Sequence, residues 1–243
     1  MYDILIIGAG PAGISAGIYA VSRGKKTLVL EQAQVGGIIG KVSTVTHYTA
    51  LQAQETGATF AARMKEQAQA AGVEIAYETV TGVELTGDVK TVHTDKGTHQ
   101  ARRVILANGG TPRKLGIPGE IELAGKGMGL NAPRDGAAYA GKNIYVVGGA
   151  DGAVKEALYL ASFARQLTII HFEDQLGCIP EFRNKIAAAD NIKLCLGSRL
   201  HAVHGTDQVE RLEIISEHDG TVQTIEDPGC GIFVYAGVMP NTQ

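Results

Sequence analysis

The chain has 243 residues, of which 44% are hydrophobic and 19% charged, and its formal net charge is −3. This composition predicts a folded protein with enough apolar material for two domains. The weakly acidic balance and the scattered basic residues argue against a nucleic-acid partner. No apolar run approaches the ~18 residues of a membrane span, and the first residues form no leader peptide. We therefore expect a cytoplasmic protein without a membrane span.

Glycine and cysteine narrow the class of protein further. The 32 glycines are about twice the ~7% of average proteins, which favours tight turns and loops that approach phosphates. The three cysteines, Cys178, Cys195 and Cys230, lie far apart in the sequence. Such spacing is typical of free thiols in a reducing compartment and gives little support to a redox role.

The first motif lies at the start of the chain. Residues 2–8 form an apolar run, the turn GAGPAG follows, and an amphipathic segment leads to a second apolar run, KTLVLE. This order predicts a strand, a glycine turn, a helix and a strand. Gly8, Gly10 and Gly13 have the G-x-G-x-x-G spacing that brings a pyrophosphate to a helix N-terminus, and Glu31 stands where an acid accepts from ribose hydroxyls. The combination favours a dinucleotide site over a glycine-rich turn without a ligand.

The middle of the chain predicts a helix over residues 58–71 and then short alternating strands, GVEIAYETV, VKTVHTD and RRVILAN. We interpret these strands as a small antiparallel sheet inserted into the first unit. Glycine- and proline-rich turns at residues 109–119 indicate a crossing between domains. We expect a first domain over residues 1–112, a second over 113–238, and a return towards the first at 239–243.

A second unit of the same kind begins at Lys142. NIYVVGG predicts a strand, residues 151–164 a helix and LTIIHFE the next strand, followed by a helix near 181–189 and short strands through IFVYAG. The chain therefore carries an internal repeat of nucleotide-binding halves. The turn at residues 148–153 has Ala150 in the middle glycine position, which adds a methyl group where backbone approaches phosphate. A turn without a ligand remains the alternative here.

The residue that closes the second unit's strand bears on the choice of nicotinamide nucleotide. Arginines there accommodate the 2′-phosphate of NADPH, whereas an acid accepts from the 2′-hydroxyl of NADH. The sequence has His171-Phe172-Glu173-Asp174. Glu173 therefore favours NADH over NADPH, because an unpaired carboxylate repels a phosphate. The alternative is that Glu173 and Asp174 are only solvated loop charges.

Several segments together resemble the low-molecular-weight thioredoxin reductase family of FAD enzymes: GAGPAG, VLEQAQVGG, ILANGGTPRKLGIPGE, DGAAYAGKNIYVVGGADGAVKEALYL and GIFVYAGVMPNT. The resemblance covers nearly the whole chain. It implies an α/β fold of two Rossmann-like dinucleotide-binding domains of the three-layer ββα type, with the second inserted in the first. It also implies a homodimer, and a reaction in which hydride passes from NADPH to flavin and electrons then pass to a dithiol.

The resemblance also assigns cofactor contacts by position. It implies that FAD is held by Gly8, Gly10, Gly13, Glu31 and Gly37, and that the nicotinamide nucleotide is lined by Gly148, Ala150, Ala153 and Glu173. Further cofactor-binding residues expected at these sites are Pro11, Ala12, His47, Val80, Asn108, Gly109, Gly149, Asp151 and Gly237. His47 lies where relatives place a polar residue near the flavin, although a surface or packing role is an equal alternative, as it is for Tyr48. We expect no metal site, and no side chain is required as a nucleophile.

Three features depart from the family pattern. The family's Cys-x-x-Cys falls at Asn131–Arg134, so both sulfurs are missing, although Asp135-Gly136 follow. Without thiolates there is no exchange with a disulfide substrate. Phe172-Glu173 replaces the family's paired arginines for NADPH. The sequence also stops at Gln243, before the segment that completes the family's FAD domain; a shortened chain, a part not represented here and a partner that supplies the missing strand all stay open.

Two hypotheses of function follow. In the first, a flavoprotein takes hydride from NADH, with NADPH the less favoured donor, and passes electrons from FAD to a quinone, dioxygen, free flavin or an electron-carrier protein. In the second, the chain is a non-catalytic nucleotide-binding or redox-sensing protein. Ala150 and the missing dithiol support the second hypothesis, whereas the intact GAGPAG turn and Glu31 support the first. We favour the enzyme, an oxidoreductase without a redox-active disulfide.

Overall fold

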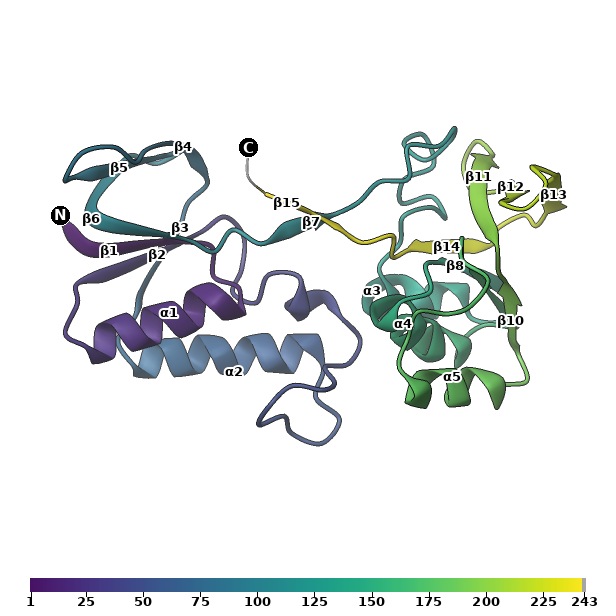
Figure 1. Ribbon diagram of the computed structural model, residues 1–243, viewed down its shortest axis with the longest axis horizontal. Helices are drawn as coiled ribbons and strands as arrows, with labels where there is room; N and C mark the ends of the chain where they lie inside the picture. Colours follow the sequence, from purple (N-terminus) through teal and green to yellow (C-terminus); the bar gives the residue numbers. More distant parts are fainter. Residues whose placement is uncertain (242–243) are drawn as a thin grey trace. The chain divides into compact units, whose positions relative to one another are not determined.

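The computed structural model describes residues 1–241 and divides the chain into two compact units (Figure 1). The first unit contains Met1–Thr111 and the chain from Met239 onward, and the second contains Pro112–Val238. Two short strands, β7 (Gly110–Pro112) and β15 (Val238–Pro240), pair where the chain leaves the first unit and returns to it. Each unit has its own sheet and hydrophobic core, so the predicted α/β fold with two nucleotide-binding sheets is confirmed.

The first unit is built on a six-stranded sheet with the order β3-β2-β1-β6-β5-β4. Its strands are β1 (Tyr2–Ile7), β2 (Thr27–Glu31), β3 (Glu74–Tyr77), β4 (Val80–Glu84), β5 (Lys90–Thr94) and β6 (Thr98–Leu106). β1, β2 and β3 run parallel, and β6 runs parallel to β1. β4, β5 and the first residues of β6 form an antiparallel ladder.

The antiparallel sheet expected from the sequence is therefore correct only in part. The segment GVEIAYETV provides β3, which pairs in parallel with β2, and RRVILAN pairs in parallel with β1. The helix α2 (Gly57–Ala70) connects β2 to β3, and a crossover of this kind brings the chain back in the same direction. Residue alternation does not report strand direction, which is why the expectation was wrong for these two segments.

Helices cover one face of this sheet, and the antiparallel ladder packs on the other. In Figure 1, α1 (Pro11–Ser22) and α2 lie on the same side of β1 and β2. Ile6 and Val29 pack with helix residues such as Ile14, whereas Leu5 packs on the opposite face with Val92 of β5. Alternate residues of a strand face opposite sides, so the continuous apolar runs of β1 and β2 reflect burial on both faces.

The second unit repeats this plan around a parallel four-stranded sheet with the order β10-β9-β8-β14. Its elements are α3 (Ala132–Asp135), β8 (Asn143–Val147), α4 (Asp151–Ala161), β9 (Gln166–Ile170), α5 (Pro180–Ala187), β10 (Ile192–Cys195), β11 (Ser198–His204), β12 (Arg211–Ser216), β13 (Val222–Glu226) and β14 (Gly231–Val234). α4 and α5 pack on one face of the sheet, and the antiparallel sheet β11-β12-β13 packs on the other. Short 3₁₀ helices lie at η1 (Ile39–Lys41) in the first unit and η2 (Gly136–Tyr139) in the second.

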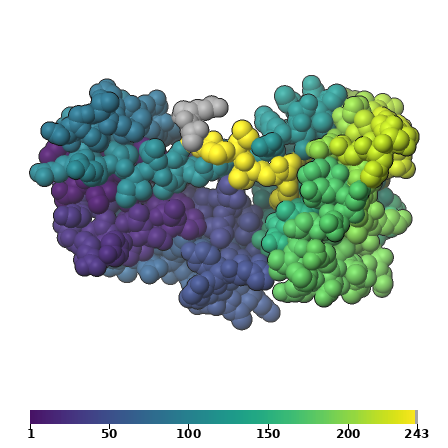
Figure 2. All heavy atoms as spheres, viewed as in Figure 1, coloured from purple at the N-terminus to yellow at the C-terminus, as the bar shows by residue number. Residues whose placement is uncertain are grey.

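The three helices predicted at 58–71, 151–164 and 181–189 correspond to α2, α4 and α5, with small shifts at their ends. Within residues 1–241, no helix is both long enough and apolar enough to cross a membrane. Figure 2 shows all heavy atoms of the chain in the same view.

The N-terminus of α2 is stabilised by hydrogen bonds between two threonines, and this contribution can be tested. Thr56 Oγ1 accepts a hydrogen bond from Thr59 N at 3.1 Å, and Thr59 Oγ1 accepts one from Thr56 N at 3.0 Å, which makes a capping box. We predict that Thr56→Ala lowers the free energy of unfolding by about 1 kcal/mol, because it removes the acceptor at the helix end. Urea unfolding measures this loss, and Thr56→Ser, which keeps the hydroxyl, serves as the control. Equal stability of the Ala and Ser variants would contradict the prediction.

Candidate cofactor-binding sites

The turn between β1 and α1 has no room for a side chain at two of its glycines. Gly8 has φ +104°, and a Cβ there would lie 2.3 Å from Ala107 O. A Cβ on Gly13 would lie 1.8 Å from Gly8 O. Glycine at both positions therefore lets α1 pack closely against β1 and the end of β6.

The remaining glycine of the motif, Gly10, faces open space. A Cβ on Gly10 would meet no protein atom within 4 Å. Gly10 is the N-cap of α1, no side-chain hydrogen bond from the described residues caps the helix, and Pro11 occupies its first turn. The first intrahelical bond runs from Ile14 N to Gly10 O at 3.0 Å, so the N–H groups of Ala12 and Gly13 lie at the positive end of the helix. This combination of space and positive potential fits a pyrophosphate.

Glu31 ends β2 beside the turn, and backbone donors hold both of its carboxylate oxygens. Oε2 accepts from Ala9 N at 2.9 Å, and Oε1 accepts from Ala33 N at 2.9 Å. Each carboxylate oxygen has a further lone pair, so the fixed carboxylate can also accept from ribose hydroxyls. Gly37 lies against the same turn, since a Cβ on it would be 3.5 Å from Gly10 Cα.

Three other residues expected at this site follow strands of the same sheet. Val80 begins β4, shortly after the end of β3, which pairs with β2, and Asn108 and Gly109 come just after β6, which pairs with β1. Asn241 Nδ2 donates to Asn108 O at 2.9 Å, and Asn241 N donates to Gly109 O at 3.0 Å. The carboxyl ends of parallel strands share one edge, so the structure brings these residues to the edge that carries the glycine turn.

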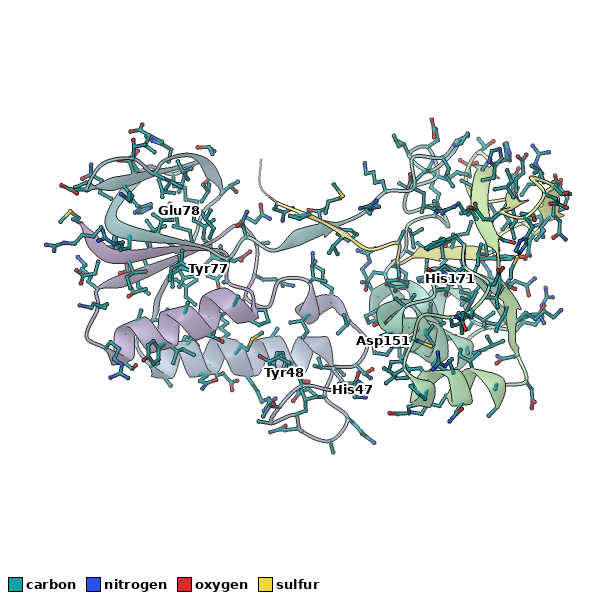
Figure 3. The ribbon with its side chains drawn as sticks, in the orientation of Figure 1. His47, Tyr48, Tyr77, Glu78, Asp151 and His171 are labelled. Carbon is teal, nitrogen blue, oxygen red and sulfur yellow. The ribbon has the colours of Figure 1, made fainter. Side chains whose placement is uncertain are left out.

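His47 and Tyr48 lie on the loop between η1 and α2 (Figure 3). His47 has a left-handed backbone with φ +58°, and Ala50 and Gln54 on the same loop have φ +61° and +58°. This conformation is costly for residues with a Cβ. The Tyr48 ring packs edge-on against Phe60 of α2, with 5.4 Å between ring centroids. Tyr48 therefore has a packing role in the first unit, and a flavin contact of His47 stays a prediction.

The second glycine turn is shaped by packing inside the second unit. Gly148 has φ +129°, and a Cβ there would lie 2.5 Å from Tyr235 O. A Cβ on Gly149 would lie 2.5 Å from the ring of His171. Ala153 is buried in the core behind the turn. These glycines are thus required by the protein's own packing, whether or not a ligand is present.

α4 begins with an uncapped N-terminus that resembles the start of α1. Ala150 is the N-cap, no side-chain hydrogen bond from the described residues caps the helix, and the first intrahelical bond runs from Val154 N to Ala150 O at 3.0 Å. Asp151 Oδ1 accepts from Ile179 N at 2.8 Å, which ties the helix start to the loop after β9. The helix end can attract a phosphate, but Ala150 carries a methyl group at the position that Gly10 leaves open.

The loop after β9 lines a pocket of about 570 Å³, which lies in the range of small-molecule sites. The lining residues are Glu173, Asp174, Gln175, Leu176, Gly177, Cys178 and Arg183. His171, which is buried beside the turn, has its Nε2 atom 3.1 Å from Glu173 Oε2. The structure therefore places Glu173 in the lining of this pocket. Arg183 was not expected here, because in the sequence it is one arginine on an ordinary amphipathic helix.

Gly237 follows β14 and has φ +93°. Its carbonyl oxygen accepts a hydrogen bond from Arg113 N at 2.9 Å, beside the paired strands β7 and β15. Gly237 therefore has a structural contact within the second unit, and a cofactor contact of Gly237 stays a prediction.

Asn131–Asp135 form a helical turn whose polar side chains bind the backbone of the turn and each other. Asn131 Oδ1 accepts from Arg134 N at 3.2 Å, and Asp135 Oδ2 accepts from Asn131 N at 2.7 Å. Arg134 Nε and Nη2 donate to the two carboxylate oxygens of Asp135, each at 2.7 Å. These bonds from Arg134 hold the pKa of the Asp135 carboxyl below its usual range. The turn is therefore a structural unit with a fixed carboxylate.

The three cysteines are free thiols. Cys178 and Cys230 are buried. Burial raises the pKa of the Cys178 thiol and raises the pKa of Cys230 to about 12. Both thiols therefore stay protonated at neutral pH and are poor nucleophiles. Among residues 1–241, no group of three or more histidine, cysteine or acidic side chains could hold a metal ion.

The contrast between Gly10 and Gly13 provides a matched pair of variants. Gly10→Ala is expected to keep the Tm of the wild type, because its methyl group meets no protein atom, and to weaken FAD binding on the order of 10-fold. Gly13→Ala is expected to lower the Tm, because its methyl group would overlap Gly8 O. Thermal unfolding and titration of the apoprotein with FAD separate the two effects. Wild-type FAD affinity in Gly10→Ala would rule out a pyrophosphate at this position.

Comparison with known proteins places these sites in a family. A family model described as pyridine nucleotide-disulphide oxidoreductase matches residues 2–243. The chain is 35% identical to a thioredoxin reductase of Peptoclostridium acidaminophilum, over the whole chain and 78% of that relative. It is 36% identical to a 34.2 kDa protein in the rubredoxin operon of Clostridium pasteurianum, over 99% of the chain and 78% of that protein.

Solved structures agree with this placement. The crystal structure of Lactococcus lactis thioredoxin reductase matches with a TM-score of 0.94 and 33% identity, over 99% of this chain and 78% of that one. T. acidophilum thioredoxin reductase matches with a TM-score of 0.92 and 26% identity over the same shares. The chain therefore belongs to the pyridine nucleotide-disulphide oxidoreductases, in the low-molecular-weight thioredoxin reductase family of FAD and NAD(P)H oxidoreductases.

Proposed function

We propose that this protein is an FAD-dependent NADH oxidoreductase whose electrons pass to an acceptor other than a disulfide. The observation that carries the proposal is the turn Asn131–Asp135, which stands where the family has its Cys-x-x-Cys. Its polar side chains bind the backbone of the turn and each other, and they include no thiol that could exchange with a disulfide. Cys178 and Cys230 are buried with raised pKa values, which supports the same conclusion.

The first unit supports FAD as the resident cofactor. The open N-terminus of α1 at Gly10 would bind the pyrophosphate, and Glu31, held by Ala9 N and Ala33 N, would bind the ribose. When bound, FAD takes up a hydride from a reduced nicotinamide and releases two electrons to an acceptor. The chain's own residues would bind and orient the two nucleotides, and none is required as a nucleophile. The retained GAGPAG turn and Glu31 favour an enzyme over a non-catalytic nucleotide-binding protein.

The charges of the second unit's pocket support NADH as the donor. Glu173 and Asp174 contribute two carboxylates to its lining, and Arg183 contributes one cation. A 2′-phosphate carries a charge of roughly −1.5 to −2 and would meet this acidic loop, whereas a 2′-hydroxyl can donate to Glu173. His171 orients the Glu173 carboxylate for this contact.

The absence of a dithiol at residues 131–134 leaves the flavin as the point from which electrons leave. Small or soluble acceptors of several kinds fit this role: a quinone, dioxygen, free flavin or an electron-carrier protein. We also propose that the protein forms a homodimer, in line with its family. NADPH remains the less favoured donor in this proposal.

Reversing the charge at Glu173 tests the donor. We expect the wild type to bind NADH more tightly than NADPH, and Glu173→Arg to shift the ratio of the two Kd values towards NADPH by at least about 10-fold. Fluorescence titration with each nucleotide measures the ratio. Glu181→Arg makes the same charge change on α5, where Glu181 pairs with Lys185, and is expected to leave the ratio near that of the wild type. A wild type that prefers NADPH would contradict the proposal that Glu173 favours NADH.

Removing the thiols tests the acceptor class. The triple variant Cys178→Ala, Cys195→Ala and Cys230→Ala is expected to keep wild-type turnover of NADH with a quinone, because no step uses a thiolate. The measurement is anaerobic oxidation of NADH by the FAD-loaded protein, with bleaching of the flavin as the first readout. Loss of turnover in a variant that is folded and yellow would overturn the proposal, as would efficient reduction of a protein disulfide by the wild type.

A further inference from the structure

We propose that Arg199 is a specificity-determining residue for the nicotinamide nucleotide, and that Glu217 keeps the charge of Arg199 away from a 2′-phosphate. This inference rests on the proposed use of a nicotinamide nucleotide at the pocket after β9. It concerns residues from β11 and from the turn between β12 and β13, which lie far in sequence from the strand end that usually determines this preference.

The Arg199 side chain lies directly over the residue that precedes Glu173. Its guanidinium Cζ is 4.5 Å from the centroid of the Phe172 ring, a cation–π contact. Its Nε atom donates to Glu217 Oε1 at 2.7 Å. The side chains of Arg199 and Glu217 are 54% and 38% exposed, so both can reach a ligand in solvent. A full positive charge thus lies over Phe172, the residue before Glu173, and is paired with a carboxylate.

Backbone hydrogen bonds hold this group against the pocket loop. Ser198 N donates to His171 O at 2.9 Å, and Gly197 N donates to Glu173 O at 2.9 Å. Glu217 N donates to Gly197 O at 2.7 Å, which brings the turn after β12 into the same layer. The start of the strand that carries Arg199 is therefore held against the backbone of His171 and Glu173.

Glycine at position 197 allows the three segments to approach so closely. Gly197 has φ +55°, and a Cβ there would lie 2.4 Å from His218 Nε2 and 2.9 Å from Asp174 Oδ1. His218 Nε2 and Asp174 Oδ1 themselves lie 2.8 Å apart. Each carboxylate at this place contacts a nitrogen of another side chain: Glu173 contacts His171, Asp174 contacts His218, and Glu217 contacts Arg199.

The guanidinium group of arginine is suited to binding phosphate, which is why the position of Arg199 matters. A guanidinium binds phosphate with two parallel hydrogen bonds, and an arginine near the end of the second strand is the group that accommodates a 2′-phosphate. In this protein the guanidinium is stacked on Phe172 and neutralised by Glu217. Because an exposed ion pair contributes little to stability, loss of the Glu217 charge is expected to free Arg199 without unfolding the unit. Glu217 would then act as the residue that withholds a phosphate ligand.

The decisive variant is Glu217→Gln, which keeps the shape of the side chain and removes its charge. We expect the Kd for NADPH to fall on the order of 5- to 20-fold, while the Kd for NADH changes by less than about 2-fold. Titration of the purified full chain with NADH and with NADPH measures both values. The gain for NADPH should shrink as salt is raised, because it comes from a solvent-exposed charge. Adding Arg199→Gln to Glu217→Gln should abolish it.

The control is Glu226→Gln on β13, which removes a carboxylate from the same three-stranded sheet. Glu226 lies 3.9 Å from Arg211 and does not pair with Arg199. This variant is expected to keep the wild-type ratio of the two Kd values. Thermal unfolding of all variants confirms that the comparison is made between folded proteins.

The outcomes separate this inference from the proposed function. If the wild type prefers NADH and Glu217→Gln leaves the ratio unchanged, the role of Arg199 is overturned and the proposed function stands. Equal weakening of both nucleotides would mean that Glu217 is only structural, and an equal NADPH gain in Glu226→Gln would mean a general charge effect; either result overturns the inference. A wild type that binds neither nucleotide overturns the proposed function and this inference together.

Discussion

The constraint on which both units depend is the geometry of parallel strands. Consecutive parallel strands must be joined by a crossover, and here the crossovers α1 and α4 begin where β1 and β8 end. The helix N-terminus, with its unpaired N–H groups, therefore lies at the carboxyl edge of the sheet. A Cβ added to Gly13 would lie only 1.8 Å from Gly8 O, which shows how closely α1 approaches β1. A phosphate-binding position is in this sense a consequence of how the sheet is connected.

The two units use this geometry differently. At Gly10 the first turn leaves space beside the helix end, and two backbone N–H groups fix the carboxylate of Glu31. In the second turn, Ala150 has a methyl group at the matching position, and the ring of His171 leaves no room for a side chain at Gly149. The distinguishing features of the second unit lie further along, in the charges around the pocket after β9. The two units thus share a backbone plan and differ in the side chains placed on it.

The turn Asn131–Asp135 illustrates the same principle for electron transfer. Its backbone forms one short helical turn, and two side-chain identities decide whether it can hold a dithiol. With Asn131 and Arg134, the polar groups bind each other and Asp135, and Arg134 keeps the Asp135 carboxyl ionised. A position that carries redox chemistry in the family therefore has a capping and ion-pairing role here.

The sequence by itself determined the features that depend on local spacing or on residue identity. These are the two glycine turns, the acids Glu31 and Glu173 at strand ends, the missing thiols and the family. The tertiary structure decided what depends on contacts between distant segments. β3 and β6 pair in parallel with β2 and β1. Arg183 of α5 lines the acidic pocket, and Arg199 of β11 lies over Phe172, which precedes Glu173. A periodic pattern reports which face of a strand or helix is buried, but strand pairing and packing alone determine which charges become neighbours.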